Sequence, residues 1–125
     1  MKLLLFFMIF FIPINGLKAS SDCVNCWGAV GTGPDGAYAW AAGFSSEDAA
    51  LNEMNIECKF ECETWLTFYE TCGSIAEDVS EDDYSKRSWG WGKHPINTVA
   101  ESLAIEGCLN DGGNECEAMV WACSM

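Results

Sequence analysis

Cysteine is the residue type in this sequence whose number and spacing most directly suggest chemistry. Cys23 and Cys26 form a Cys-x-x-Cys pair, the spacing that lowers thiol pKa values in thioredoxin-like redox proteins. Those motifs open a helix within a βαβ unit, whereas this pair precedes an expected strand, so the sequence disfavours a redox role. Zinc would need reduced thiolates, and the only histidine, His94, precedes Pro95 and lacks the spacing of a zinc ligand. We therefore expect neither a metal nor a cofactor.

Side chains suited to nucleophilic or acid–base catalysis are present but form no recognisable set. No serine lies in a Gly-x-Ser-x-Gly elbow. Among 19 acidic residues, two carboxylates within reach of each other are expected by chance, so a glycosidase pair receives no support. The acidic segment 77–83 lacks the spacing of an EF-hand, and we expect a solvated loop there. A small hydrolase using His94 and a nearby carboxylate is the least favoured function, and we assign no catalytic residues. The serines considered are Ser45, Ser46, Ser74, Ser85, Ser88 and Ser102.

The start of the chain has the pattern of a cleavable signal peptide. Lys2 supplies a positive charge, and residues 3–12 form an unbroken apolar run that is too short to span a bilayer, which needs about 20 residues. We expect cleavage after Ala19, with Gly16 or Ser20 as alternatives; a buried N-terminal helix or strand is the weaker interpretation. Residues 1–19 are thus the expected signal peptide and 20–125 a single domain without a membrane span.

Charge and cysteine content limit the partners and the compartment of this expected domain. Residues 20–125 hold four basic and all 19 acidic residues, a net charge of 4 − 19 = −15. Such a surface repels phosphate backbones and anionic headgroups, which argues against nucleic-acid binding and allows a basic protein partner. All eight cysteines lie in the same part. An even number of cysteines in a short exported chain indicates disulfides, so we expect a secreted or periplasmic protein.

The chain also contains an internal repeat. Two helices are expected at equivalent places, and a strand beginning with Cys-Glu follows each, at Cys62 and at Cys116. An aromatic strand precedes each helix, at 38–40 and at 89–91, and a further strand lies earlier, at 28–30 and at 73–75. Each half therefore has the order strand, strand, helix, strand, and the prediction is an α+β domain of two pseudo-symmetric halves, about 26–71 and 72–124. The matched helical positions are Ala50, Met54 and Cys58 in one half and Ala100, Ala104 and Cys108 in the other.

The ends of the two helices have their own signals. Ser45 or Ser46 is suited to cap the first helix. Thr98 with Glu101 has the pattern of a capping box for the second helix, and Gly107 is suited to its end.

These ordered landmarks resemble a known family of exported bacterial proteins, catalogued as domain of unknown function 4189. The resemblance covers roughly Cys26 to Cys123 and rests on Trp27-Gly28-Ala29-Val30, the helix ending in Cys58, the strand from Cys62 to Cys72-Gly73 and the second pass ending in Cys123. It implies export and an α+β fold, and it brings no catalytic residues. The chain departs from the family pattern in Cys23 and Cys26, in the acidic segment 77–83 and in Met54-Asn55 of the first helix.

The repeat suggests how the eight cysteines pair. Symmetry favours Cys58–Cys62 and Cys108–Cys116 first. A Cys72–Cys123 bridge between two strand ends comes next and would tie the halves together. Cys23–Cys26 remains, unless Cys26 takes one of the strand-end partners instead.

The tryptophans are open to two interpretations. Small disulfide-rich domains fill their cores with aromatic side chains, and we expect this for most of the six. Trp89 and Trp91 stand two apart on one strand and must face the same side, where an exposed pair would form a platform for a sugar ring or a partner protein. The leading function is thus a non-catalytic binding module acting on another protein, as an inhibitor, immunity factor or accessory subunit. The alternative is a carbohydrate or cell-wall binding module that uses Trp89 and Trp91.

Overall fold

The computed structural model describes residues 23–125, so the expected signal peptide at residues 1–19 lies outside the described residues. Six strands and two helices follow in the order that the repeat predicted, β-β-α-β twice. The first half consists of β1 (Trp27–Thr32), β2 (Tyr38–Phe44), α1 (Glu47–Glu57) and β3 (Thr64–Tyr69). The second half consists of β4 (Thr71–Asp78), β5 (Trp89–His94), α2 (Asn97–Asn110) and β6 (Cys116–Ser124), and short 3-10 turns at Pro34–Gly36 and Tyr84–Lys86 complete the chain.

Each half forms its own antiparallel sheet with its first strand in the centre. The strand orders are β2-β1-β3 and β5-β4-β6. Val30 in β1 lies opposite Trp40 of β2 and Leu66 of β3, and the matching residue Ile75 in β4 lies opposite Trp91 and Val120. The two halves therefore agree in register as well as in order, which confirms the predicted α+β fold with two pseudo-symmetric halves.

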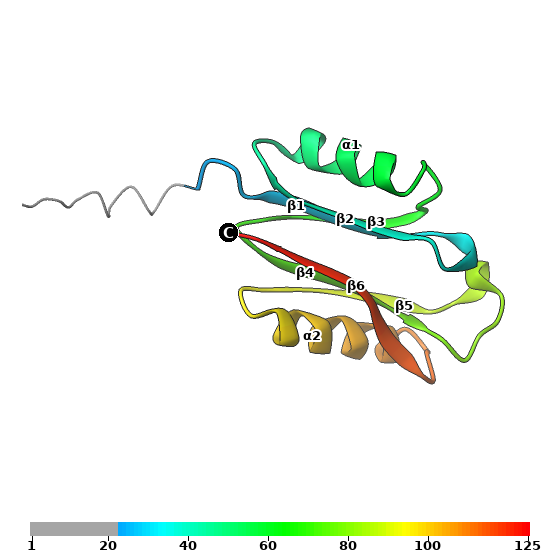
Figure 1. Cartoon of the computed structure of the whole chain (residues 1–125). Coiled ribbons are helices and arrows are strands. Elements are labelled where there is room, and N and C mark those ends of the chain that lie inside the picture. Colours follow the sequence, from blue (N-terminus) through cyan, green and yellow to red (C-terminus); the bar gives the residue numbers. More distant parts are fainter. Residues whose placement is uncertain (1–22) are drawn as a thin grey trace, which may run out of the picture.

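The two sheets pack against each other, and a helix covers the outer face of each (Figure 1). The layer between the sheets is built from five buried residues: Val30, Phe68, Ile75, Val120 and Ala122. Phe68 fills the centre of this layer because the two central strands carry glycine beneath its ring: a Cβ at Gly73 would lie 2.8 Å from Phe68 Cε2, and one at Gly28 would lie 2.6 Å from Phe68 Cζ.

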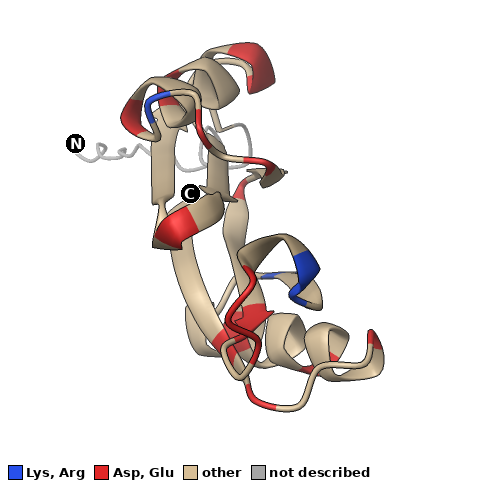
Figure 2. Ribbon diagram, turned by 90° about the vertical axis from the view of Figure 1, so that its right-hand side faces the viewer, with Lys and Arg blue, Asp and Glu red and all other residues tan. Residues whose placement is uncertain are grey.

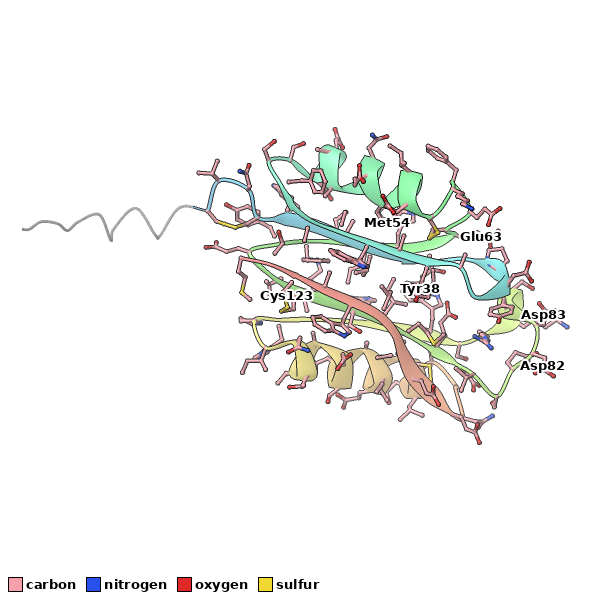
Figure 3. All side chains as sticks on the ribbon, in the orientation of Figure 1. Tyr38, Met54, Glu63, Asp82, Asp83 and Cys123 are labelled. Atoms are coloured by element: carbon pink, nitrogen blue, oxygen red, sulfur yellow. A yellow bond between two sulfur atoms is a disulfide. The ribbon has the colours of Figure 1, made fainter. Side chains whose placement is uncertain are left out.

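The outer layers have small cores of their own. Met54 of α1 is fully buried against Ala29, Ala39 and Ala41 of the first sheet (Figure 3). On the other side, Ala104 and Cys108 of α2 pack against Ala76 of β4. Alanine and glycine dominate both contacts, so each helix lies close to its sheet. None of the described helices is long and apolar enough to cross a membrane.

Four disulfides join the eight cysteines: Cys23–Cys26, Cys58–Cys62, Cys72–Cys123 and Cys108–Cys116. Three of these are the pairs that the repeat favoured, and Cys23–Cys26 is the pair that remained. The expectation that Cys72–Cys123 ties the two halves together is wrong, because Cys72 lies in β4 directly opposite Cys123 of β6. The bridge therefore lies within the second sheet.

The structure corrects three details of the helix and strand ends. Ser46 caps α1 as expected, since its Oγ accepts a hydrogen bond from the backbone N–H of Ala49 at 3.1 Å. The capping box at Thr98 is absent because α2 begins at Asn97, with Ile96 at its N-cap, which places Thr98 inside the first turn. Gly107 does not end α2, which continues to Asn110, and β3 begins at Thr64, two residues after Cys62.

Candidate functional site

Most of the tryptophans lie on the surface, contrary to the expectation that they fill the core. Five of the six are between 39% and 57% exposed, and the fully buried core uses smaller residues except for Phe68. The reason is their position on edge strands of the two sheets, where a side chain has a neighbouring strand on one side only. The exposed tryptophans are Trp40, Trp65, Trp89, Trp91 and Trp121.

Trp89 and Trp91 share one face of β5, as their spacing predicted. They lie opposite Glu77 and Ile75 of β4, so they point away from α2, whereas Gly90 between them is buried under the helix. Trp89 is 39% and Trp91 is 52% exposed. The Lys93 ammonium lies 5.7 Å from the centre of the Trp91 ring, within the range of a cation–π contact.

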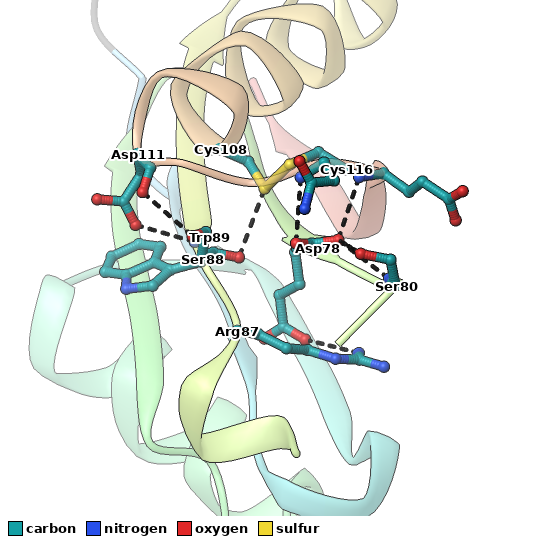
Figure 4. Close-up of a disulfide and its surroundings, with 11 residues drawn as sticks. Asp78, Ser80, Arg87, Ser88, Trp89, Cys108, Asp111 and Cys116 are labelled. Atoms are coloured by element: carbon teal, nitrogen blue, oxygen red, sulfur yellow. Dashed lines mark hydrogen bonds and ion pairs between the residues drawn. A yellow bond between two sulfur atoms is a disulfide. The ribbon is translucent and has the colours of Figure 1, made fainter. Parts of the chain in front are cut away.

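A groove of about 410 Å³ follows this outer edge of β5 and reaches the last turns of α2. We call it the β5–α2 groove; its lining residues are Trp89, Gly90, Trp91, Gly107 and Asp111. The carboxylate of Asp111 accepts a hydrogen bond from the backbone N–H of Trp89 at 3.4 Å, and the hydroxyl of Ser88 donates to the Asp111 carbonyl (Figure 4).

A second groove of about 410 Å³ follows the outer edge of β2 beside α1. This β2–α1 groove is lined by Tyr38, Ala39, Trp40, Ala41, Ala42, Phe44, Glu53 and Glu57. Tyr38 and Trp40 lie on the face of β2 that is turned toward the second sheet, as Figure 3 shows for Tyr38, and they are 61% and 57% exposed. Glu53 and Glu57 are one helical turn apart on α1.

The two grooves occupy equivalent places in the two halves but differ in shape and charge. Gly90 in β5 stands where β2 has Ala39, and a Cβ at Gly90 would collide with the backbone of α2. The methyl group of Ala39 instead separates β2 from α1. At the position of Glu57, α2 has Gly107. The first groove therefore has carboxylates on its helical wall, whereas the second has closely packed glycine.

Acidic residues greatly outnumber basic residues in the described part of the chain. Between residues 23 and 71 there are eight acidic residues and one basic residue, Lys59. Figure 2 shows Asp and Glu on the helices and loops of both halves, whereas Lys and Arg occupy only a few short segments. Glu53 and Glu57 are not among the site residues expected from the sequence, although their spacing of four on an expected helix places them on one face.

The acidic segment 77–83 is only partly the solvated loop that we expected. Glu77 and Asp78 belong to β4 and are 9% and 6% exposed. Glu77 lies between the sheets, where it accepts a hydrogen bond from the Thr32 hydroxyl at 2.6 Å and forms an ion pair with Arg87 at 3.4 Å. The reason is the continuation of β4 to Asp78, which carries both carboxylates into the packed part of the domain.

Asp78 organises the connection between α2 and β6 (Figure 4). Its carboxylate accepts hydrogen bonds from the Ser80 side chain and from the backbone N–H groups of Ser80, Asn114 and Glu115. The hydrogen bond from the Ser80 side chain is the largest cause that lowers the pKa of Asp78 from its usual 3.8 to about 2. We assign a structural role to both Glu77 and Asp78.

The structure brings no catalytic constellation together around His94. Its Nδ1 accepts a hydrogen bond from the backbone N–H of Ile96 at 3.0 Å. A histidine acting as the base of a catalytic triad instead donates its Nδ1 hydrogen to a carboxylate. Among the described residues, the serine hydroxyls that form hydrogen bonds bind backbone groups or nearby carboxylates: Ser46, Ser74, Ser80, Ser85, Ser88, Ser102 and Ser124.

The cysteines and acidic residues form no metal centre in the part of the chain from 23 to 125. All eight cysteines are in disulfides, and no group of three or more His, Cys, Asp or Glu side chains is arranged to hold a metal ion there. Cys26 is buried beside the start of β1, and the Tyr69 hydroxyl donates a hydrogen bond to the Cys23 carbonyl.

Comparison with known proteins gives one match. The model of a family described as "Domain of unknown function (DUF4189)" matches residues 27–123, which cover both helices, the first five strands and β6 as far as Cys123. Neither a curated protein nor a solved structure matches the chain.

Proposed function

This chain belongs to the family of domain of unknown function DUF4189, a name that assigns no activity, and we propose that it is an exported, non-catalytic module that binds another protein. It acts in the periplasm or outside the cell, as an inhibitor, immunity factor or accessory subunit does. Its partner carries a basic surface.

Export is supported by two independent features. The N-terminal sequence has a basic residue followed by an apolar run of signal-peptide length. The eight cysteines form four disulfides, and such bonds persist in oxidising compartments but are rare in the cytosol.

The β2–α1 groove is the observation that carries the binding proposal. It combines a strand edge that pairs with no further strand among the described residues, two aromatic side chains that are more than half exposed, and two carboxylates on the facing helix. Exposed aromatic residues beside a groove are typical of protein-binding surfaces. The excess of acidic residues over the single lysine in this half favours a basic partner.

A catalytic function has weaker support. The hydrogen bond that His94 accepts on Nδ1 occupies the nitrogen that a triad would use to bind its carboxylate. A hydrolase would show an activity that disappears in His94→Ala while the fold stays intact, and a broad substrate panel on both proteins tests this third possibility.

The binding proposal is tested by capture and reconstitution. The disulfide-bonded protein is immobilised and exposed to cell-envelope and culture fractions of the producing cells, with free protein as competitor. We expect one retained protein, identified by mass spectrometry, that forms a complex of defined stoichiometry when both components are purified. If no protein is retained competitively, or the purified pair does not associate, the proposal is wrong.

A carbohydrate-binding function is the second candidate, and the β5–α2 groove favours it. Trp89 and Trp91 present indole rings on one face, and the Asp111 carboxylate lines the same groove. Sugar sites combine aromatic faces with a few polar groups that bind hydroxyls. Lys93 beside Trp91 adds a hydrogen-bond donor.

Titration of tryptophan fluorescence with peptidoglycan fragments and common glycans tests this second candidate. Quenching that is lost in Trp89→Ala/Trp91→Ala and kept in Trp65→Ala supports it, because Trp65 is similarly exposed on a different strand. Absence of quenching by every glycan argues against it.

A further inference from the structure

We propose that the β2–α1 groove binds an extended, basic segment of the partner as an added strand along the free edge of β2. This inference rests on the protein-binding function proposed above and names its mode. Three features of the groove support it: the strand edge, the spacing of the carboxylates and the aromatic face.

The backbone N–H and C=O groups along the outer edge of β2 are accessible. Tyr38, Ala39, Trp40, Ala41 and Ala42 are consecutive and therefore alternate between the two faces of the sheet, yet all of them line the groove. A groove that touches both faces in sequence must follow the strand edge, where every second residue turns its N–H and C=O groups outward. These groups pair with an incoming strand in β-augmentation.

The regular part of the edge, before the register shift beyond Ala41, also lacks the usual protection against strand addition. Natural edge strands commonly carry a charged residue or a proline that blocks pairing. The seven residues of β2 include neither, whereas the equivalent edge strand β5 contains Lys93.

The carboxylates on α1 match the repeat of a strand. Glu53 and Glu57 are four residues apart on a helix, which corresponds to about 6 Å along its axis. Alternate residues of a strand are about 6.6 Å apart on one face. Because α1 extends along the strands of its sheet (Figure 1), lysine or arginine at positions i and i+2 of an added strand would lie opposite these two carboxylates.

The opposite face of the added strand would meet aromatic side chains. Tyr38 and Trp40 lie on the side of β2 away from α1. Next to them, a pocket of about 400 Å³ is lined by Trp40, Trp121, Ala122 and Cys123, which connects this face to β6. Apolar or aromatic residues at positions i+1 and i+3 would fill this side. The groove therefore selects an alternating pattern of basic and apolar residues.

A second copy of this chain is a poor occupant of the groove. A copy that added its own β2 would bring no basic residue to Glu53 and Glu57, since that strand has the sequence YAWAAGF. The strong net negative charge of both copies also opposes their association.

Peptide selection on the disulfide-bonded protein tests the inference. A random decapeptide display library is enriched on the protein, and the selected peptides are synthesised with a fluorescent label. We expect lysine or arginine at alternate positions separated by β-branched or aromatic residues. Enrichment of no peptide, or of peptides without this alternation, would overturn the proposal.

Two variants separate the charge effect of the groove from general acidity. In Glu53→Gln/Glu57→Gln, the selected peptide should bind about tenfold more weakly, and raised salt should reduce this difference. Glu101→Gln/Glu106→Gln removes the same charge from α2, outside both grooves, and should change binding less than twofold. Equal losses in the two variants would contradict a site in the β2–α1 groove.

Two further measurements identify strand addition. In an added strand, only every second peptide residue directs its N–H group toward β2. N-methylation of these residues should abolish binding, whereas N-methylation of the residues between them should leave binding intact. Hydrogen exchange should slow in β2; slowing confined to β3 or β5, or concentration-dependent dimerisation through β2, would overturn the inference. If a partner is captured equally well by Glu53→Gln/Glu57→Gln, the protein-binding function stands and this mode of binding is wrong.

Discussion

Replacing Gly90 by alanine is expected to lower the free energy of unfolding by about 3 kcal/mol. Gly90 lies in β5 directly beneath α2, and a Cβ there would be 2.5 Å from the carbonyl carbon of Gly107 and in collision with the Ala104 carbonyl oxygen and the Cys108 nitrogen. All three are helix backbone atoms, so no side chain can rotate away. The helix must move outward by about 1 Å to restore an ordinary contact, and this movement loosens the packing of Ala104 and Cys108 on Ala76.

The equivalent position in the other half provides a matched control. Ala39 occupies the place of Gly90 in β2 and already holds α1 away from the strand by one methyl group. Ala39→Gly removes that methyl group and should cost about 1 kcal/mol through backbone entropy and lost packing. In a domain of this size, 1 kcal/mol shifts the Tm by roughly 4–8 °C, so Gly90→Ala should lower the Tm by roughly 12–24 °C and Ala39→Gly by roughly 4–8 °C.

Thermal and urea unfolding followed by circular dichroism measure both variants, with the four disulfides verified by mass spectrometry. A Gly90→Ala protein within 1 kcal/mol of the parent would refute the close contact of α2 with β5. Equal costs for the two variants would refute the difference in helix spacing, and with it the structural distinction between the two grooves.

Three further predictions concern the stability of the domain. Arg87→Met leaves the buried Glu77 carboxylate without its cation and should cost about 3 kcal/mol in urea unfolding; a cost below 1 kcal/mol would mean that the pair is solvated. Cys72→Ala/Cys123→Ala opens a disulfide between residues 51 apart and should cost about 4 kcal/mol, and a variant as stable as the parent would contradict the pairing. Because the pKa of Asp78 in the folded protein is lowered to about 2 from its usual 3.8, the ionised carboxylate stabilises the fold above pH 4, and this stabilisation is lost as the pH falls toward 2. The Tm of Asp78→Asn should therefore depend less on pH in this window than the Tm of the parent protein. The same pH profile for both proteins would contradict the role of the hydrogen bonds to Asp78.

Much of the fold could be predicted because its signals are local and occur twice. Apolar residues at helical spacing, the cap at Ser46 and the Cys-Glu landmarks each depend on a few neighbouring residues, and their repetition separates them from chance. The same repetition suggested three of the four cysteine pairs that the structure has. The repetition wrongly suggested that the Cys72–Cys123 bridge joins the two halves, because equivalent positions along the chain do not show which strands are neighbours in a sheet.

The candidate site was less predictable because the exposure of a side chain depends on whether its strand lies at the centre or at the edge of a sheet. Trp89 and Trp91 were expected on one face from their spacing alone. That five of the six tryptophans lie outside the core follows from their position on edge strands, which no local pattern reveals. Glu77 was read as part of a solvated loop, although the continuation of β4 buries it against Thr32 of the other sheet.

The sequence by itself determined the order of strands and helices, their division into two equivalent halves, the acidic charge and the cysteine pairs that symmetry favours, because each of these depends on residue type and spacing along the chain. Only the tertiary structure decided that the halves stack sheet against sheet and that an alanine or a glycine under each helix sets its distance from the edge strand. These distances sum many contacts between residues far apart in sequence. Together with the glycine that α2 has at the position of Glu57, they distinguish an acidic groove beside β2 from a closely packed one beside β5.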